Sequence, residues 1–147
     1  MDYVIRKAEL SDIEDVRTLM ALLTGHEMSV EEAEARLHMI DKSPIEELFV
    51  LEAQTKIKGL LGFRIRENLE ESSRYGEISV IVTDPHSRRS GFGRALMEFA
   101  QKRAREKGCK GTWLVSGFGR EEEAHKFYSE LGYKITGYRF VRLFEGD

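Results

Sequence analysis

A twelve-residue stretch beginning at residue 84 carries the residue types and spacing best suited to binding a ligand. It reads Asp-Pro-His-Ser-Arg-Arg-Ser-Gly-Phe-Gly-Arg-Ala and places Gly91 and Gly93 between an extended segment and a helical one. Glycine lets the backbone turn sharply and lets a ligand approach it closely. The amides that open the following helix point outward at the positive end of the helix dipole, which favours a phosphate group. Three arginines add positive charge to this loop: Arg88, Arg89 and Arg94. The loop is therefore predicted to bind an anion.

Two common phosphate-binding motifs do not fit this loop. A Walker loop needs Gly-Lys-Ser/Thr, whereas this chain has Gly-Arg-Ala at residues 93–95. A dinucleotide fingerprint needs a third glycine where Leu96 stands. An arginine, two spacers, Gly-x-Gly and a following helix form a more specific pattern than Gly-x-Gly alone.

The charge distribution points the same way. Residues 86–110 carry eight Lys/Arg against two Asp/Glu, whereas residues 1–85 carry ten against 18, in a chain of net charge −3. A local basic segment in an acidic protein favours a defined anionic ligand over nucleic acid. A helix with a solvated basic face is the structural alternative, which charge alone leaves open.

Hydrophobic periodicity predicts the elements that position this loop. Strands are expected at 3–6, 48–53, 57–65, 75–83 and 112–115, and one or two more within 133–144. Helices are expected after capping boxes that start at Ser11 and Ser29, after Gly91, and over 121–131. The order β-α-α-β-β-β-α-β-α-β(β) predicts an α/β domain, with a mixed sheet and helices on both faces, over residues 1–147.

Composition narrows the class of protein. The chain has 147 residues, 41% hydrophobic and 33% charged, which suits one folded domain. Its single cysteine, Cys109, excludes an intrachain disulfide and a cysteine metal cluster, and we expect no metal site. Without a long apolar run or a signal-peptide pattern, we expect a cytoplasmic protein that binds neither membrane nor nucleic acid.

Two motifs together resemble the GNAT superfamily of N-acetyltransferases. The sequence Arg-Arg-Ser-Gly-Phe-Gly at 88–93 matches the family's acetyl-coenzyme-A loop, Arg/Gln-x-x-Gly-x-Gly/Ala. The stretch 124–133, Ala-His-Lys-Phe-Tyr-Ser-Glu-Leu-Gly-Tyr, resembles its second signature, and 137–140 resembles a common closing strand. The resemblance implies the GNAT-like acyl-coenzyme-A N-acyltransferase fold and acetyl transfer from acetyl-coenzyme A to a primary amine of a small molecule or peptide, with coenzyme A as product. Homodimers are frequent in such families.

The resemblance also implies the residues that bind the cofactor. Backbone groups of three strand residues would pair with the pantetheine arm like an added strand: Ile81, Val82 and Thr83. The amides of the loop and helix start would hold the pyrophosphate: Arg88, Arg89, Ser90, Gly91, Phe92, Gly93 and Arg94. The family often has Asn where Glu121 stands here, and Ser116 and Arg120 are the alternatives for its contact.

Two residues are predicted to move protons. Tyr128 matches the family's tyrosine beside the departing sulfur, and its structural alternative is a tyrosine packed against the sheet. Glu77 lies eleven residues before Arg88, the offset of the base in the histone-acetylating branch, while other branches have a carboxylate at the place of Ser79. An exposed strand glutamate without a catalytic role is the alternative. A non-catalytic acyl-coenzyme-A sensor on the same fold is the competing hypothesis. The sequence does not specify the acceptor or the oligomeric state.

Overall fold

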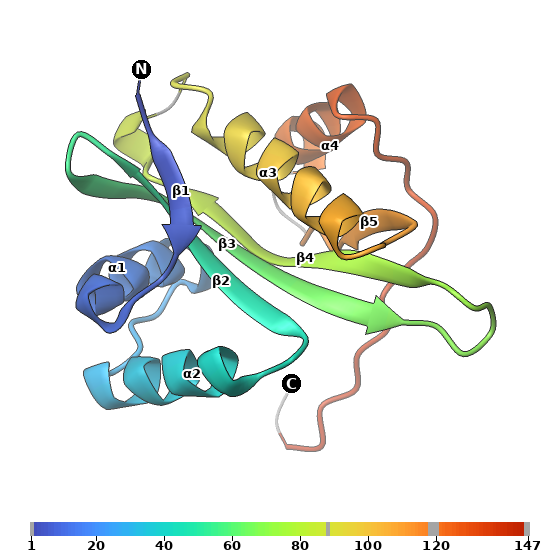
Figure 1. The fold of residues 1–147 in the computed structure, drawn as a ribbon, viewed down its shortest axis with the longest axis horizontal. Coiled ribbons are helices and arrows are strands. Elements are labelled where there is room, and N and C mark those ends of the chain that lie inside the picture. The colour runs from blue at the N-terminus through green and yellow to red at the C-terminus, as the bar shows by residue number, and fades with distance from the viewer. Residues whose placement is uncertain (1, 88, 118–120, 146–147) are drawn as a thin grey trace. The chain divides into compact units, whose positions relative to one another are not determined.

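A computed structural model of the chain describes residues 2–87, 89–117 and 121–145. It forms two compact units, Met1–Trp113 (unit 1) and Leu114–Asp147 (unit 2). The elements follow one another along the chain as Figure 1 traces by colour. The expectation of a single domain over 1–147 stays a prediction.

Unit 1 is built on a five-stranded sheet in the order β1-β2-β3-β4-β5, whose first four strands pair antiparallel. The strands are β1 Val4–Lys7, β2 Glu46–Ala53, β3 Lys56–Glu67, β4 Arg74–Thr83 and β5 Gly111–Leu114. The helices are η1 Leu10–Asp12, α1 Ile13–Thr24, α2 Val30–Lys42, η2 Pro85–Ser87 and α3 Phe92–Glu106. Unit 2 contains α4, Glu121–Glu130. The predicted order is confirmed as far as α4.

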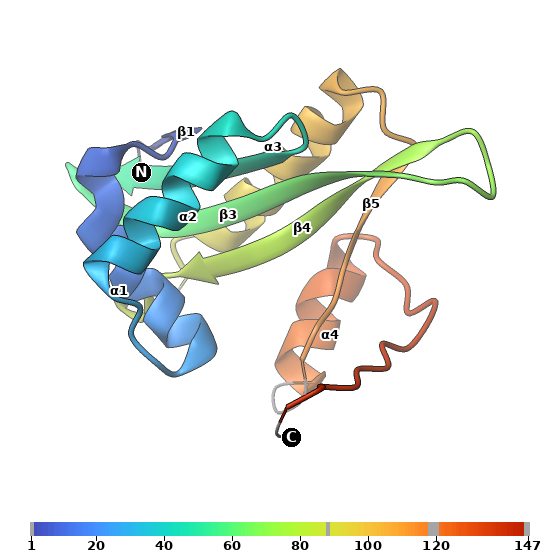
Figure 2. The ribbon, with the colours of Figure 1, turned by 90° about the horizontal axis from the view of Figure 1, so that it is seen from below.

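One face of the sheet packs against α1, with α2 beside it (Figure 2). Val50 and Leu60 are fully buried on this face and contact Val16 and Leu19 of α1. Val16 and Leu19 share one stripe of α1 because apolar residues three or four apart lie on the same side of a helix. Burying each such side chain stabilises the fold by about 1.5–3 kcal/mol.

The opposite face packs against α3. Phe49 follows Leu48 and precedes Val50, so it points to the other side of the sheet, where its ring lies 4.8 Å from that of Phe99. Gly59 of β3 lies so close to α3 that a Cβ there would be 2.9 Å from Leu96. The prediction of helices on both faces is therefore confirmed. Helix α3 packs closely on the sheet whose strand β4 precedes it in the chain.

One predicted helix cap is confirmed and the other is wrong. Ser29 caps α2, because its hydroxyl accepts the backbone N–H of Glu32 at 3.1 Å. Ser11 does not cap α1, which begins at Ile13 after a short 3-10 turn. The Asp12 carboxylate closes this turn instead by accepting the Glu9 N–H at 2.7 Å, and it also accepts two N–H groups of Arg6 at 2.8 and 2.9 Å.

The final strands predicted within 133–144 are also wrong. Described residues 133–143 of unit 2 contain neither strand nor helix. The alternation of apolar residues that suggested strands is present, but Tyr138 and Phe140 are 91% and 93% exposed. A strand needs a neighbour for its backbone hydrogen bonds, and within unit 2 this segment has only α4 before it.

Candidate functional site

The loop between β4 and α3 has the backbone that the glycine pattern predicted. Gly91 adopts a left-handed conformation, with φ 77°, and serves as the N-cap of α3. Arg89 is also left-handed, with φ 71°, although it has a side chain. A non-glycine residue in this region costs about 1–3 kcal/mol and occurs preferentially where a ligand is bound. Arg89 is therefore held in a backbone conformation that its residue type does not favour, whereas Gly91 adopts its conformation without that cost.

The first turn of α3 contains backbone donors that have no acceptor inside the helix. The first intrahelical bond runs from Ala95 N to Gly91 O at 2.9 Å. The N–H groups of Phe92, Gly93 and Arg94 therefore have no acceptor within the helix. Gly91 provides no capping side chain, and a Cβ there would meet nothing within 4 Å. These donors, at the positive end of a 15-residue helix, suit a phosphate oxygen.

Two of the three predicted arginines can be placed. Arg89 is exposed, and the Arg94 side chain is 53% exposed, with a long contact of 3.8 Å to Glu98. Arg88 lies outside the described residues. The Phe92 side chain turns inward, 3% exposed, against the ring of Tyr3, so only its backbone N–H can serve a ligand. Two of the predicted cations are therefore exposed, one in this loop and one in the first turn of α3.

Asp84 anchors the first turn of this loop, a role that the sequence interpretation missed. Its carboxylate accepts the His86 N–H at 3.0 Å and lies 3.2 Å from the Lys58 ammonium. The His86 N–H and the Lys58 charge hold the pKa of Asp84 below its usual value. Aspartate before proline typically forms such a turn, so the Asp84-Pro85 pair is the signal that could have identified it.

The predicted pantetheine edge lies at the C-terminal end of β4. Ile81, Val82 and Thr83 pair on one side with Leu61, Leu60 and Gly59 of β3. On the other side β5 begins where Lys110 N donates to Arg74 O, at the first residue of β4. Because β5 has only four residues, it runs beside the N-terminal end of β4, near Arg74, and not beside Thr83 at the other end.

A β-bulge interrupts β4 between this edge and Glu77. The register pairs Gly62 with Val80 and Phe63 with Ile78, so Ser79 is an extra residue in β4. Gly62 makes room for it, because a Cβ there would lie 2.6 Å from the Ser79 hydroxyl. Bulges are common beside active sites, where they redirect a strand and its side chains.

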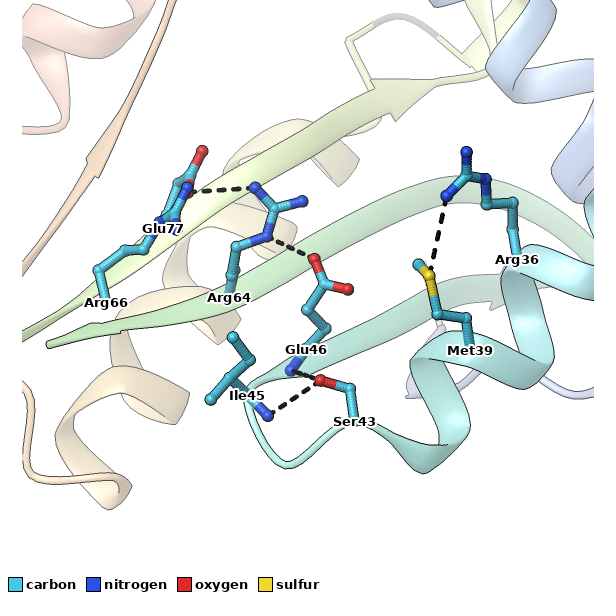
Figure 3. A network of polar contacts seen from close by, with 8 residues as sticks. All are labelled: Arg36, Met39, Ser43, Ile45, Glu46, Arg64, Arg66 and Glu77. Atoms are coloured by element: carbon cyan, nitrogen blue, oxygen red, sulfur yellow. Dashed lines mark hydrogen bonds and ion pairs between the residues drawn. The ribbon is translucent and has the colours of Figure 1, made fainter.

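Glu77 belongs to a row of alternating charges across β2, β3 and β4, which Figure 3 shows. Its Oε1 lies 2.8 Å from Arg66 Nε and 3.4 Å from Arg64 Nη1, and Arg64 Nε meets Glu46 Oε1 at 2.5 Å. The Glu77 side chain is 13% exposed, so it is not the solvated strand residue of the alternative interpretation. Sequence reasoning missed both arginines, since their partnership depends on the strand register.

Tyr128 lies in α4 of unit 2 and is half-buried. Its ring packs edge-on against those of Phe127 and Tyr133, with centroids 5.2 and 6.1 Å away. The backbone N–H of Tyr133 donates to Tyr128 O at 3.0 Å and closes the helix. This packing fixes the tyrosine on its helix. The catalytic pairing of Tyr128 with Glu77 stays a prediction.

The remaining sequence candidates are placed as follows. Glu121 begins α4 and is exposed, Ser116 is exposed, and Arg120 lies outside the described residues. Burial raises the pKa of the Cys109 thiol, which fits a structural cysteine better than a nucleophile. Among the described residues there is no group of three or more side chains that could hold a metal ion. None of the described helices is long and apolar enough to cross a bilayer.

Comparison with known proteins adds independent evidence. The sequence model of the Acetyltransferase (GNAT) family matches residues 13–133. An aminoalkylphosphonate N-acetyltransferase of Salmonella typhimurium is 30% identical over 87 residues, which are 59% of this chain and 56% of that protein. The uncharacterized N-acetyltransferase YhdJ of Bacillus subtilis is 32% identical over 94 residues, 63% of this chain and 65% of that protein. The matches therefore span between half and two thirds of these relatives.

Solved structures agree on the fold. A transcriptional regulator from Bacillus halodurans superposes with a TM-score of 0.88 at 26% identity, covering 97% of this chain and all of that one. An acetyltransferase from Trypanosoma brucei superposes with a TM-score of 0.80 at 27% identity, covering 97% of this chain and 99% of that one. The arrangement of strands and helices is one that a known group of proteins shares.

Proposed function

Because the chain belongs to the GNAT family of acetyltransferases, we propose that it transfers an acetyl group from acetyl-coenzyme A directly to a primary amine of a small molecule or peptide. The observation that carries this proposal is the loop between β4 and α3, whose left-handed Gly91 opens a helix that has no side-chain cap among the described residues. That arrangement suits a pyrophosphate, and the family uses this cofactor.

The described residues fit the coenzyme in two places. The space in front of Gly91 is open, and the amides from Arg89 to Arg94, with the two exposed arginines, would hold the pyrophosphate. The outer edge of β4 at Ile81–Thr83 would hold the pantetheine arm by β-strand addition. When bound, the coenzyme supplies the acetyl group as a thioester.

Two side chains would manage the protons of the transfer. A primary amine has a pKa of about 10.4 and is mostly protonated at neutral pH, so a base must accept its proton. Glu77, partly buried on β4 two residues before the bulge, takes this role directly or through water. Tyr128 donates a proton to the sulfur as the carbon–sulfur bond breaks and the carbon–nitrogen bond forms. The second proton that the nitrogen loses on becoming an amide then returns to the Tyr128 oxygen. No covalent enzyme intermediate is needed.

A calorimetric titration tests the binding half of this proposal. We expect acetyl-coenzyme A to bind with one-to-one stoichiometry and to bind far more tightly than 3′-phospho-ADP, which lacks only the acetylated pantetheine arm. The difference in affinity reports the β4 edge, while the binding of 3′-phospho-ADP reports the amides of α3. The absence of acetyl-coenzyme A binding at millimolar concentration would refute the proposed function.

A further inference from the structure

The row of charges next to the proposed active site suggests which amines the protein accepts. Glu46, Arg64, Glu77 and Arg66 alternate in sign across three strands, joined by contacts of 2.5, 3.4 and 2.8 Å (Figure 3). Strand register places Glu46 opposite Arg64 and Arg64 opposite Glu77, so these side chains share one face of the sheet. The row holds two negative and two positive groups and is neutral as a whole.

Arg66 ends this row and is its most exposed member, with 46% of its side chain accessible against 13% for Glu77. Its Nε contacts Glu77 Oε1, while a guanidinium carries four more N–H donors on its two terminal nitrogens. A guanidinium edge binds a carboxylate, phosphate or phosphonate through two parallel hydrogen bonds. Arg66 can therefore hold Glu77 and an incoming anionic group together.

Within the described part of the chain, the arginine contacts of Glu77 use one oxygen of its carboxylate. Both arginines meet the same atom, Oε1. An amine that approaches this carboxylate comes close to the positive charge of Arg66. A cation with no negative group would be repelled there, whereas a zwitterion offers each charge an opposite partner.

We propose that the acceptor is a small zwitterionic amine, whose nitrogen faces Glu77 and whose anionic group binds Arg66. This inference rests on the proposed function and refines its acceptor. Arg64, held between Glu46 and Glu77, is a positioning residue that fixes the direction of the Glu77 carboxylate. Arg66 is the specificity-determining residue.

Steady-state kinetics of thiol release test this inference with four amines that differ in their second group. Aminomethylphosphonate and β-alanine are the zwitterions, while ethanolamine and propylamine carry no anion. We expect kcat/KM to be higher for the zwitterions by about tenfold or more, the value of one charge-assisted interaction. Arg66→Gln should raise KM for the zwitterions by about the same factor, a larger change in KM than the one it causes for propylamine.

Arg74→Gln is the matched control. Arg74 is also a strand arginine, 40% exposed, and it pairs with Glu67 at 2.6 Å outside the charge row. It should not alter the preference for zwitterions, and Arg66→Lys should restore part of it through its charge. No acetylation of either zwitterion, or an equal loss for propylamine in Arg66→Gln, would overturn the inference. Because acetyl-coenzyme A binding is measured without any acceptor, such a result leaves the proposed cofactor site standing.

Discussion

Replacing Gly91 with valine tests the coenzyme loop most sharply, because the chain contains a matched control for it. Gly91 has φ 77° and open space around a Cβ, and so does Gly108, with φ 74°, just beyond the other end of α3. A residue with a side chain in this conformation costs about 1–2 kcal/mol. Gly91→Val and Gly108→Val should therefore lower the free energy of unfolding by similar amounts.

The two variants should differ in their response to coenzyme. For a chain of this length, 1 kcal/mol corresponds to a Tm shift of about 2–4 °C, so each variant should melt about 2–8 °C lower. At a ligand concentration of 100 times Kd, binding adds about 2.7 kcal/mol of stability. That gain corresponds to a Tm rise of about 5–11 °C in the wild type and in Gly108→Val. Gly91→Val should show none, because its side chain fills the approach to the α3 amides.

Differential scanning fluorimetry with and without acetyl-coenzyme A measures both effects in one experiment. The reasoning fails if Gly91→Val gains the same stabilisation from coenzyme as the wild type. It also fails if Gly108→Val loses that stabilisation, since the loss would then follow from backbone strain and not from the loop.

Three further substitutions test the proton-transfer and stability arguments. Tyr128→Phe should lower kcat by about 10²-fold or more and leave coenzyme affinity unchanged, and an unaltered kcat would remove the acid role. Glu77→Gln should reduce kcat by about 10²-fold in thiol release with no loss of coenzyme binding, whereas wild-type turnover would exclude it as the base. The hydrogen bonds from Arg6 lower the pKa of Asp12, whose side chain is 7% exposed. The ionised carboxylate therefore stabilises the fold above its unfolded pKa of about 3.9. This stabilisation is lost as the pH falls through the lower pKa of the folded state. Asp12→Asn should therefore cost about 1–3 kcal/mol at pH 7, with the difference from wild type fading below about pH 4 in urea titrations; a pH-independent difference would contradict this account.

Local signals predicted most of the fold because they coincide with the packing. The apolar stripes of α1 and α3 meet the alternating residues of β2 and β3, so periodicity and tertiary contacts agree. Ser29 caps its helix through its own hydroxyl, a contact within four residues that a local pattern can predict. At Ser11 the Asp12 carboxylate takes over the turn through the Glu9 N–H, and its ion pair with Arg6 of β1 is a contact that local sequence patterns do not show.

The candidate site divides in the same way. Its loop could be predicted because left-handed backbone at a helix start requires glycine, and Gly91 is where the pattern placed it. The arginine partners of Glu77 could not be predicted, because they depend on which residues of β3 lie opposite β4 next to a bulge. The strands that were wrongly predicted after α4 show the opposite situation. Apolar and polar residues alternate there, but the described part of unit 2 contains no neighbouring strand with which this segment could pair.

The most direct test of the central claim is to follow the acetyl group itself. The purified protein is incubated with acetyl-coenzyme A labelled in the acetyl carbon and with β-alanine, and both products are quantified by mass spectrometry. We expect labelled N-acetyl product and free coenzyme A to appear in equal amounts, many times the amount of protein. Coenzyme that binds but stays acetylated across β-alanine, aminomethylphosphonate, ethanolamine and propylamine would contradict catalysis and favour the acyl-coenzyme-A sensor.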